Sequence, residues 1–134
     1  MRLLLALVIV VLAAPAQAQP RRQAPAEFTL SAGAAPASVA IQAGGPDRNA
    51  APVATVSHSG GMLSIYVTSD TDTTLLVADP SGRWQCSDDA SGSNPGVTFA
   101  AGESGAYTVW VGTFSAEAAG AAARLTAVQG QPRW

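Results

Sequence analysis

The chain contains no lysine, one cysteine and one histidine, and each scarcity argues against a class of function. Its basic residues are all arginines and form no continuous basic patch, so nucleic-acid binding is not expected. Cys86 cannot form an intrachain disulfide, and the core must therefore stabilise the fold without one. Two interpretations of Cys86 stay open: a half-buried strand thiol, or a thiol that reacts or pairs with another chain.

Catalytic side chains are equally scarce. His58 is followed directly by Ser59-Gly60-Gly61, which is typical of a loop, and the sequence contains no Gly-x-Ser-x-Gly motif. One histidine and one cysteine make a poor zinc site. We therefore predict no catalytic residues and no enzyme activity, and a peptidase is the least favoured of the alternatives.

The chain also lacks an apolar run long enough to span a bilayer. The run from Leu3 to Ala14 has about 12 residues, whereas a span needs roughly 20. It follows Arg2 and precedes Ala16-Gln17-Ala18, which has the small-x-small form of a cleavage site. Residues 1–18 are therefore predicted to be a signal peptide, and the mature protein is expected in the periplasm or outside the cell.

The rest of the chain suits one domain. Residues 19–27 are rich in Pro, Gln, Arg and Ala and are predicted to be a flexible linker. Residues 28–129 are predicted to form the domain, and residues 130–134 a C-terminal tail in which Trp134 is mobile. The alanine-rich residues 115–124 are expected to form a loop with one helical turn.

Alternation of apolar and polar side chains predicts most of the strands. In residues 63–68, Leu63, Ile65 and Val67 point to one face of a strand and the polar residues to the other. Similar patterns or short apolar runs predict strands around residues 39–41, 73–78, 83–86, 97–99, 105–112 and 125–128, and residues 28–30 are expected to start the ordered part. Short strands separated by turn residues are typical of a sandwich or a barrel.

Asp79-Pro80-Ser81-Gly82 is predicted to be a type I turn. Aspartate at the first position accepts hydrogen bonds from nearby backbone N–H groups, proline presets φ at the second, and glycine suits the fourth. The turn should join strand 73–78 to strand 83–86 as a hairpin.

Five motifs follow one another between residues 61 and 114: a strand ending at Val67, Asp72-Thr73-Thr74-Leu75, the Asp79–Gly82 turn, Asp88-Asp89, and Gly105-Ala106-Tyr107-Thr108-Val109. In order and spacing they resemble the bacterial pre-peptidase C-terminal domain family. The resemblance implies an all-β fold, namely a single antiparallel β-sandwich that is jelly-roll-like. It also implies an accessory module that accompanies a secreted peptidase without being one. Some relatives bind calcium or extracellular polymers such as collagen or polysaccharide.

An acidic loop is the candidate metal site. Asp88 and Asp89 precede Ser91, Ser93 and Asn94, and calcium prefers six to eight oxygen ligands of these kinds. The family resemblance assigns a candidate calcium role to Asp88 and Asp89. In the alternative interpretation, the two carboxylates only accept hydrogen bonds from nearby backbone amides.

Two tryptophans are the candidate ligand-binding residues. Trp84 is in phase with Cys86, whereas Trp110 is out of phase with the apolar set Tyr107, Val109 and Val111. If both rings are exposed on one face, they can stack on sugar rings or anchor a protein partner. The alternative is that each ring fills the second side of the sandwich or shields a hairpin.

Together these patterns predict an exported, non-catalytic accessory or binding module of pre-peptidase C-terminal type. Its expected partner is a protein or a carbohydrate, and no membrane span should remain once the signal peptide is removed. A calcium-stabilised structural module is the alternative, with calcium as the candidate cofactor.

Overall fold

The structure is a computed structural model of the chain, and it describes residues 26–29, 35–44 and 51–134. The predicted signal peptide and most of the predicted linker lie outside the described residues. Within the described part of the chain, no helix is both long and apolar enough to cross a membrane.

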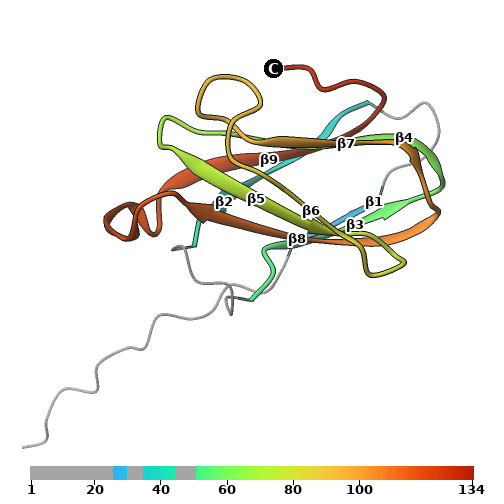
Figure 1. The fold of residues 1–134 in the computed structure, drawn as a ribbon, viewed down its shortest axis with the longest axis horizontal. Coiled ribbons are helices and arrows are strands. Elements are labelled where there is room, and N and C mark those ends of the chain that lie inside the picture. Colours follow the sequence, from blue (N-terminus) through green and yellow to red (C-terminus); the bar gives the residue numbers. More distant parts are fainter. Residues whose placement is uncertain (1–25, 30–34, 45–50) are drawn as a thin grey trace, which may run out of the picture.

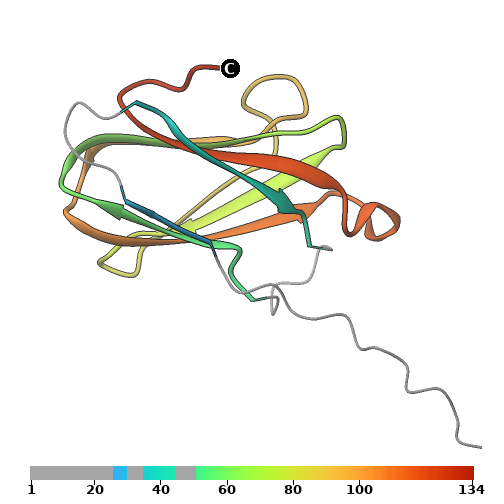
Figure 2. The same cartoon turned by 180° about the vertical axis from the view of Figure 1, so that it is seen from behind.

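The described strands form two sheets that face each other (Figures 1 and 2). The five-stranded sheet has the order β1 (Ala26–Thr29), β3 (Ala54–His58), β8 (Gly105–Thr113), β5 (Thr73–Ala78) and β6 (Trp84–Ser87). The four-stranded sheet has the order β2 (Ala37–Gln42), β9 (Ala122–Gln129), β4 (Gly61–Thr68) and β7 (Gly96–Gly102). Strands β1 and β6 are therefore the two edges of the larger sheet.

The topology from β2 to β9 is that of a jelly roll. The chain crosses to the other sheet at each connection except the β5–β6 hairpin, and all pairs among these eight strands are antiparallel. The outcome is the double-sheet arrangement of two four-stranded layers, with β1 added in parallel beside β3. The predicted single β-sandwich of jelly-roll type is confirmed.

Most strand positions agree with the alternation in the sequence, with two departures. Strand β1 begins at Ala26, two residues inside the segment predicted to be linker. Strand β3 is not predicted, because its inward positions include Ala54 and His58 and so lack a clear apolar pattern. The single helical turn expected in residues 115–124 is present as η1 (Ala116–Ala118).

The core lies between the two sheets. Alternate residues of β3, β5 and β8 are buried and face the buried residues of β4 and β9. The five-stranded sheet contributes Val56, Leu75, Val77, Tyr107 and Val109, and the four-stranded sheet contributes Leu63, Ile65, Val67 and Leu125. Burying one such aliphatic side chain contributes about 1.5–3 kcal/mol. The Tyr107 hydroxyl reaches the rim of the core and donates to the Glu103 carbonyl oxygen at 2.9 Å.

The C-terminal segment, Gly130 to Trp134, packs against the outer face of β4, although the sequence predicts a mobile tail. The Tyr66 hydroxyl donates to the Arg133 carbonyl oxygen at 2.9 Å, and the Tyr66 and Trp134 ring centroids are 4.8 Å apart. The Ser64 hydroxyl donates to the Gly130 carbonyl oxygen at 2.6 Å. The outward side chains Ser64 and Tyr66 are consequently buried on the outer side of the sheet.

Candidate binding face

The two tryptophans lie together on the outer face of the five-stranded sheet. In β8, Trp110 is opposite Leu76 of β5, and Trp84 of β6 is opposite Ala78 of the same strand. Because cross-strand partners point to the same side of a sheet, both rings face outward. Their centroids are 4.9 Å apart with an angle of 36° between the ring planes. Trp84 is 57% exposed and Trp110 is half-buried, so Trp110 supports one side of the exposed ring.

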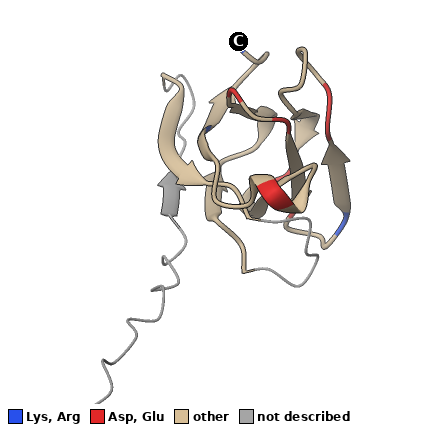
Figure 3. Cartoon of the chain, turned by 90° about the vertical axis from the view of Figure 1, so that its left-hand side faces the viewer, with Lys and Arg blue, Asp and Glu red and all other residues tan. Residues whose placement is uncertain are grey.

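We call the outward residues around this pair the tryptophan face. It consists of Thr55, Ser57, Thr74, Leu76, Ala78, Trp84, Cys86, Ala106, Thr108, Trp110 and Gly112. None of these residues is charged. The charged residues of the described strands are Arg124 of β9 and Glu27 of β1, which is opposite Thr55 of this face. Figure 3 shows other acidic residues in the loops and in the short helical turn. The residues that β3, β5, β6 and β8 contribute to the face are therefore uncharged, and they present an exposed indole and several hydroxyl groups.

The β5–β6 hairpin fixes the position of Trp84. Gly82 N–H donates to the Asp79 carbonyl oxygen at 3.0 Å, and Asp79 N–H to the Arg83 carbonyl oxygen at 2.9 Å. Gly82 has φ of +84°, which suits a type I turn followed by a bulge residue. The structure thus confirms the predicted turn and hairpin, with the paired strand beginning at Trp84.

Asp79 holds this hairpin through four hydrogen bonds to its buried carboxylate. Oδ1 accepts from the Ser81 hydroxyl at 2.7 Å and from the Ser81 and Arg83 backbone N–H groups. Oδ2 accepts from Arg83 Nε at 2.8 Å. The hydrogen bond from the Ser81 hydroxyl, with those from Arg83, lowers the pKa of Asp79 from 3.8 to about 2 even though burial acts in the opposite direction.

Arg83 is the charged residue next to Trp84, and its charge is paired. Besides Asp79, its guanidinium contacts Glu103 through an Nη2–Oε1 distance of 3.1 Å. The hydrogen bond with Asp79 raises the pKa of Arg83 above its usual value. The guanidinium therefore adds little unpaired charge beside the tryptophan face.

Cys86 also lies on the tryptophan face, opposite Leu76. The thiol is exposed, which corrects the expectation of a half-buried strand residue. It belongs to β6, an edge strand of the sheet. Reaction or pairing with another chain stays a prediction for this residue.

The acidic loop after β6 is organised by its backbone. Ala90 and Ser91 N–H groups donate to the Asn94 carbonyl oxygen, and the Asn94 side-chain oxygen accepts from Ser69 N–H at 2.9 Å. Asp88 and Asp89 are exposed. Among the described residues, no three or more His, Cys, Asp or Glu side chains are grouped so that they could hold a metal ion. The calcium role of Asp88 and Asp89 remains a prediction.

His58 lies in the core rim at the end of β3. It is buried, its Nε2 is 3.1 Å from the Gly61 carbonyl oxygen, and its ring meets Tyr107 edge-on at 6.0 Å between centroids. The imidazole is thus a packed, hydrogen-bonded side chain that a substrate at the surface does not reach.

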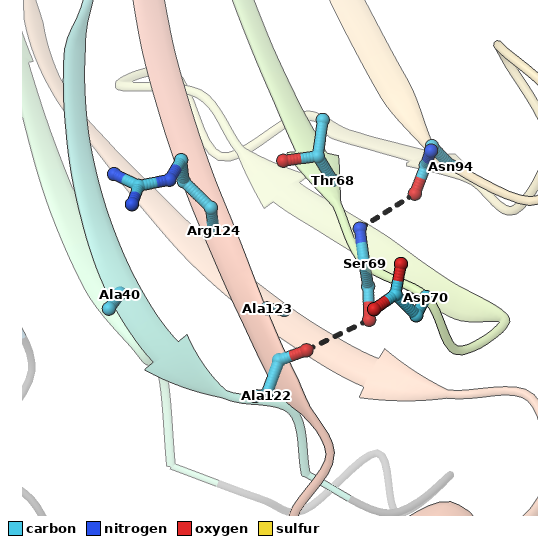
Figure 4. Close-up of a pocket in the computed structure, with 8 residues that line it drawn as sticks. All are labelled: Ala40, Thr68, Ser69, Asp70, Asn94, Ala122, Ala123 and Arg124. Atoms are coloured by element: carbon cyan, nitrogen blue, oxygen red, sulfur yellow. Dashed lines mark hydrogen bonds between the residues drawn. The ribbon is translucent and has the colours of Figure 1, made fainter.

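A hollow lies on the outer side of the four-stranded sheet (Figure 4). Its volume is about 460 Å³, and Ser69 crosses it with hydrogen bonds to Asn94 and to the Ala122 carbonyl oxygen. Its walls are Ala40, Thr68, Ser69, Asp70, Asn94, Ala122, Ala123 and Arg124. Sequence reasoning does not find it, because its residues come from distant strands and carry no motif. It is open to solvent, and we assign it no ligand.

The fold and this face together define a jelly-roll sandwich with an aromatic surface on one sheet. Among solved structures, the fold is similar to that of Aeromonas hydrophila PliG, a periplasmic lysozyme inhibitor of g-type lysozyme, with a TM-score of 0.51 and 16% sequence identity. The similarity covers 78% of this chain and 97% of PliG, and at this identity it concerns the fold alone. No family model and no curated protein sequence matches the chain. The resemblance to the pre-peptidase C-terminal domain family therefore stays a prediction.

Proposed function

We propose that this protein is an exported, non-catalytic binding module whose ligand, a protein or a carbohydrate, docks on the tryptophan face. The observation that carries the proposal is the 57% exposure of Trp84, which is packed against Trp110 on the outer face of the sheet. Exposed apolar patches often mark interaction sites, and tryptophan is enriched among residues that dominate binding energy.

The two outer faces of the sandwich differ in a way that supports this choice. On the four-stranded sheet, the chain covers Tyr66 with its own C-terminal segment and the Trp134 ring. On the five-stranded sheet, Trp84 stays open to solvent. Trp134 is itself 47% exposed, so the five-stranded sheet is distinguished by an exposed indole that is packed against a second tryptophan.

A non-catalytic, exported role has further support. His58 is buried and engaged with Gly61, which leaves no surface imidazole to act as a general base. PliG, which shares the fold, is periplasmic and is an inhibitor of an enzyme. The order of the motifs from Val67 to Val109 supports an accessory role of pre-peptidase C-terminal type.

The test compares the wild-type protein with Trp84→Ala and with the double variant Trp84→Ala/Trp110→Ala. Each is immobilised and exposed separately to a panel of polysaccharides and to an extract of exported proteins. Trp134→Ala is the matched control, because it removes the same side chain from the opposite sheet. We expect a ligand that wild type and Trp134→Ala retain and that both Trp84 variants lose. Equal retention of every ligand by all four proteins would refute the proposal.

A further inference from the structure

We infer that the partner of the tryptophan face is a protein that adds an extended segment with basic residues as a new strand beside β6, an inference that rests on the proposed function. Four features of this sheet edge carry it. They are unpaired backbone groups, access from both faces of the sheet, the exposed Trp84 ring, and the two carboxylates that follow the strand.

The backbone of β6 has hydrogen-bonding groups that point away from its sheet. Among the described strands β6 is the last of its sheet, and β5 is its strand partner. The hydrogen bond from Asp79 N–H to the Arg83 carbonyl oxygen makes these two residues a hydrogen-bonded pair. Such pairs alternate with non-hydrogen-bonded pairs along an antiparallel ladder, so the N–H and C=O groups of Trp84 and Cys86 point away from β5. A row of this kind is a template for pairing with another chain.

The edge is accessible from both faces of the sheet. The outward residues of β6 are exposed. Gln85 points to the inner side, as its partner Val77 does, yet Gln85 is exposed whereas Val77 is buried. The four-stranded sheet therefore does not cover the middle of β6. At the far end of the strand, Ser87 Oγ accepts a hydrogen bond from Gly96 N–H at 3.1 Å, which anchors β6 to β7.

Trp84 distinguishes β6 from the edges of the four-stranded sheet. The large apolar residues of those edges, such as Ile41 of β2 and Phe99 of β7, pack in or against the core. The Trp84 ring instead lies on the outer face beside the unpaired edge, supported by Trp110 at 4.9 Å between centroids. Outward side chains of an added strand would pack against this ring. Tryptophan is enriched among the residues that dominate binding energy at protein interfaces.

The charges at the two ends of β6 set the chemistry and the direction of the added segment. Asp88 and Asp89 directly follow the strand, are exposed, and form no ion pair with another described residue. At the other end, Arg83 is already paired with Asp79 and Glu103. Basic residues of a partner are thus attracted to the Asp88 end. In an antiparallel pair, which is slightly more stable than a parallel one, that end meets the N-terminal part of the added segment.

A second copy of this chain and a carbohydrate fit the edge less well. In an antiparallel pair of two β6 strands, the Asp88 end of one copy would lie beside the Arg83 end of the other, where two carboxylates already surround one guanidinium. Like charges placed together at an interface disfavour that partner. A carbohydrate has no repeating amide groups to match the N–H and C=O groups of Trp84 and Cys86, whereas an extended peptide does.

The experiment measures the binding of synthetic peptides to the native protein by NMR, with the backbone amide signals of β6 as the readout. The probes are capped hexapeptides in which two charged residues precede alternating valine and threonine. One begins with Lys-Lys, one begins with Glu-Glu, and a third carries Lys-Lys at its C-terminal end instead. We expect the first to bind at least about threefold more tightly than either of the others, because two exposed ion pairs are formed. Added salt should reduce the difference.

Two substitutions at one position test the backbone pairing. Cys86→Pro removes an N–H group that points to the free edge, where an edge strand tolerates proline, whereas Cys86→Ser keeps that group. We expect at least about fivefold weaker peptide binding in Cys86→Pro, from the lost hydrogen bond, and wild-type binding in Cys86→Ser. Trp84→Ala should weaken binding at least as much as Cys86→Pro. The double variant Asp88→Asn/Asp89→Asn should lose the preference for the peptide that begins with Lys-Lys. Circular dichroism checks that each variant is folded.

The outcomes separate this inference from the proposed function. Failure of all three peptides to bind, equal binding of the three, or equal affinities of Cys86→Pro and Cys86→Ser would overturn the inference. Peptide binding that Trp84→Ala leaves unchanged would overturn it as well. The proposed function would still stand if the ligand screen found a polysaccharide or protein that wild type retains and Trp84→Ala loses. Absence of any ligand that depends on Trp84, in both experiments, would overturn both.

Discussion

At the scale of the residue, the Asp79 carboxylate stabilises the hairpin that carries Trp84. Its carboxylate is buried and accepts hydrogen bonds from Ser81 and Arg83. The pKa falls from 3.8 to about 2 because these donors favour the charged form. The folded-state pKa is thus below the unfolded value, and the carboxylate stabilises the fold fully only above the unfolded pKa.

This linkage gives a prediction for acid stability. As the pH falls from about 4 to 2, the stabilisation from the Asp79 carboxylate should be lost. Asp79→Asn should be less stable than wild type at neutral pH, and the difference should shrink across this window. Urea unfolding at a series of pH values measures it, with Asp89→Asn as a control that removes an exposed carboxylate. A constant difference between wild type and Asp79→Asn down to pH 2 would contradict the prediction.

At the scale of the element, the C-terminal segment acts as a cover for the four-stranded sheet. The Trp134 ring packs on Tyr66, and a Cβ at Gly96 would lie 2.9 Å from that ring. We expect Trp134→Ala to destabilise the protein by about 1–2 kcal/mol, from lost apolar burial and the lost aromatic pair. Urea denaturation measures the change.

The control for this prediction is Phe114→Ala. Phe114 is 68% exposed, and its removal should change the free energy of unfolding by no more than about 0.5 kcal/mol. Equal effects of the two substitutions would mean that the packing of Trp134 on Tyr66 contributes nothing to stability.

Elements differ in how far the sequence predicts them. Strands β4, β5 and β8 were predictable because alternate residues such as Leu63 and Leu75 enter the core. Strand β3 was not, because Ala54 is small and His58 is polar, so burial there leaves no apolar signal. The C-terminal cover escapes prediction for another reason: besides the Trp134 ring, it is held through the carbonyl oxygens of Gly130 and Arg133, which every residue type possesses.

The candidate site, like the strands, could be predicted from the sequence only in part. The phase of Trp110 in its strand was predictable, since Tyr107 and Val109 occupy the inward positions. The contact between Trp110 and Trp84 depends on β5 lying between β8 and β6, with Leu76 opposite Trp110. That pairing joins residues far apart in the chain, and local patterns do not determine it. The sequence could name both tryptophans but could not place them together.

At the scale of the whole molecule, calcium is the first test. Calcium needs six to eight oxygen ligands, whereas the acidic side chains of the described residues, Asp88 and Asp89 among them, form no group of three or more. A calcium site would therefore need oxygen ligands from Ser91, Ser93, Asn94 or backbone carbonyls beside Asp88 and Asp89. The calcium role predicts that the melting temperature rises by several degrees in excess calcium relative to chelator and that Asp89→Ala abolishes the rise. Equal melting temperatures in calcium and chelator would contradict it.

The jelly-roll connections predict that the two sheets unfold together. The core between them is a single cluster that includes Val56 and Val109 from one sheet and Ile65 and Leu125 from the other. The chain also crosses between sheets at nearly every connection, so neither sheet is a continuous piece of sequence. Unfolding of either sheet would expose the buried apolar residues of the other sheet. The whole domain should therefore unfold in a single transition with one free energy of unfolding.

Tryptophan fluorescence can test this cooperativity one sheet at a time. In Trp134→Phe, the fluorescence comes from Trp84 and Trp110 on the five-stranded sheet, whereas in Trp84→Phe/Trp110→Phe it comes from Trp134 on the four-stranded sheet. In each variant we expect the urea midpoint from fluorescence to equal the midpoint from circular dichroism, because one core couples the two sheets. Midpoints that differ within one variant would show that a sheet unfolds by itself. The tryptophan face would then be a surface on a separately stable layer, and binding there would stabilise only that layer.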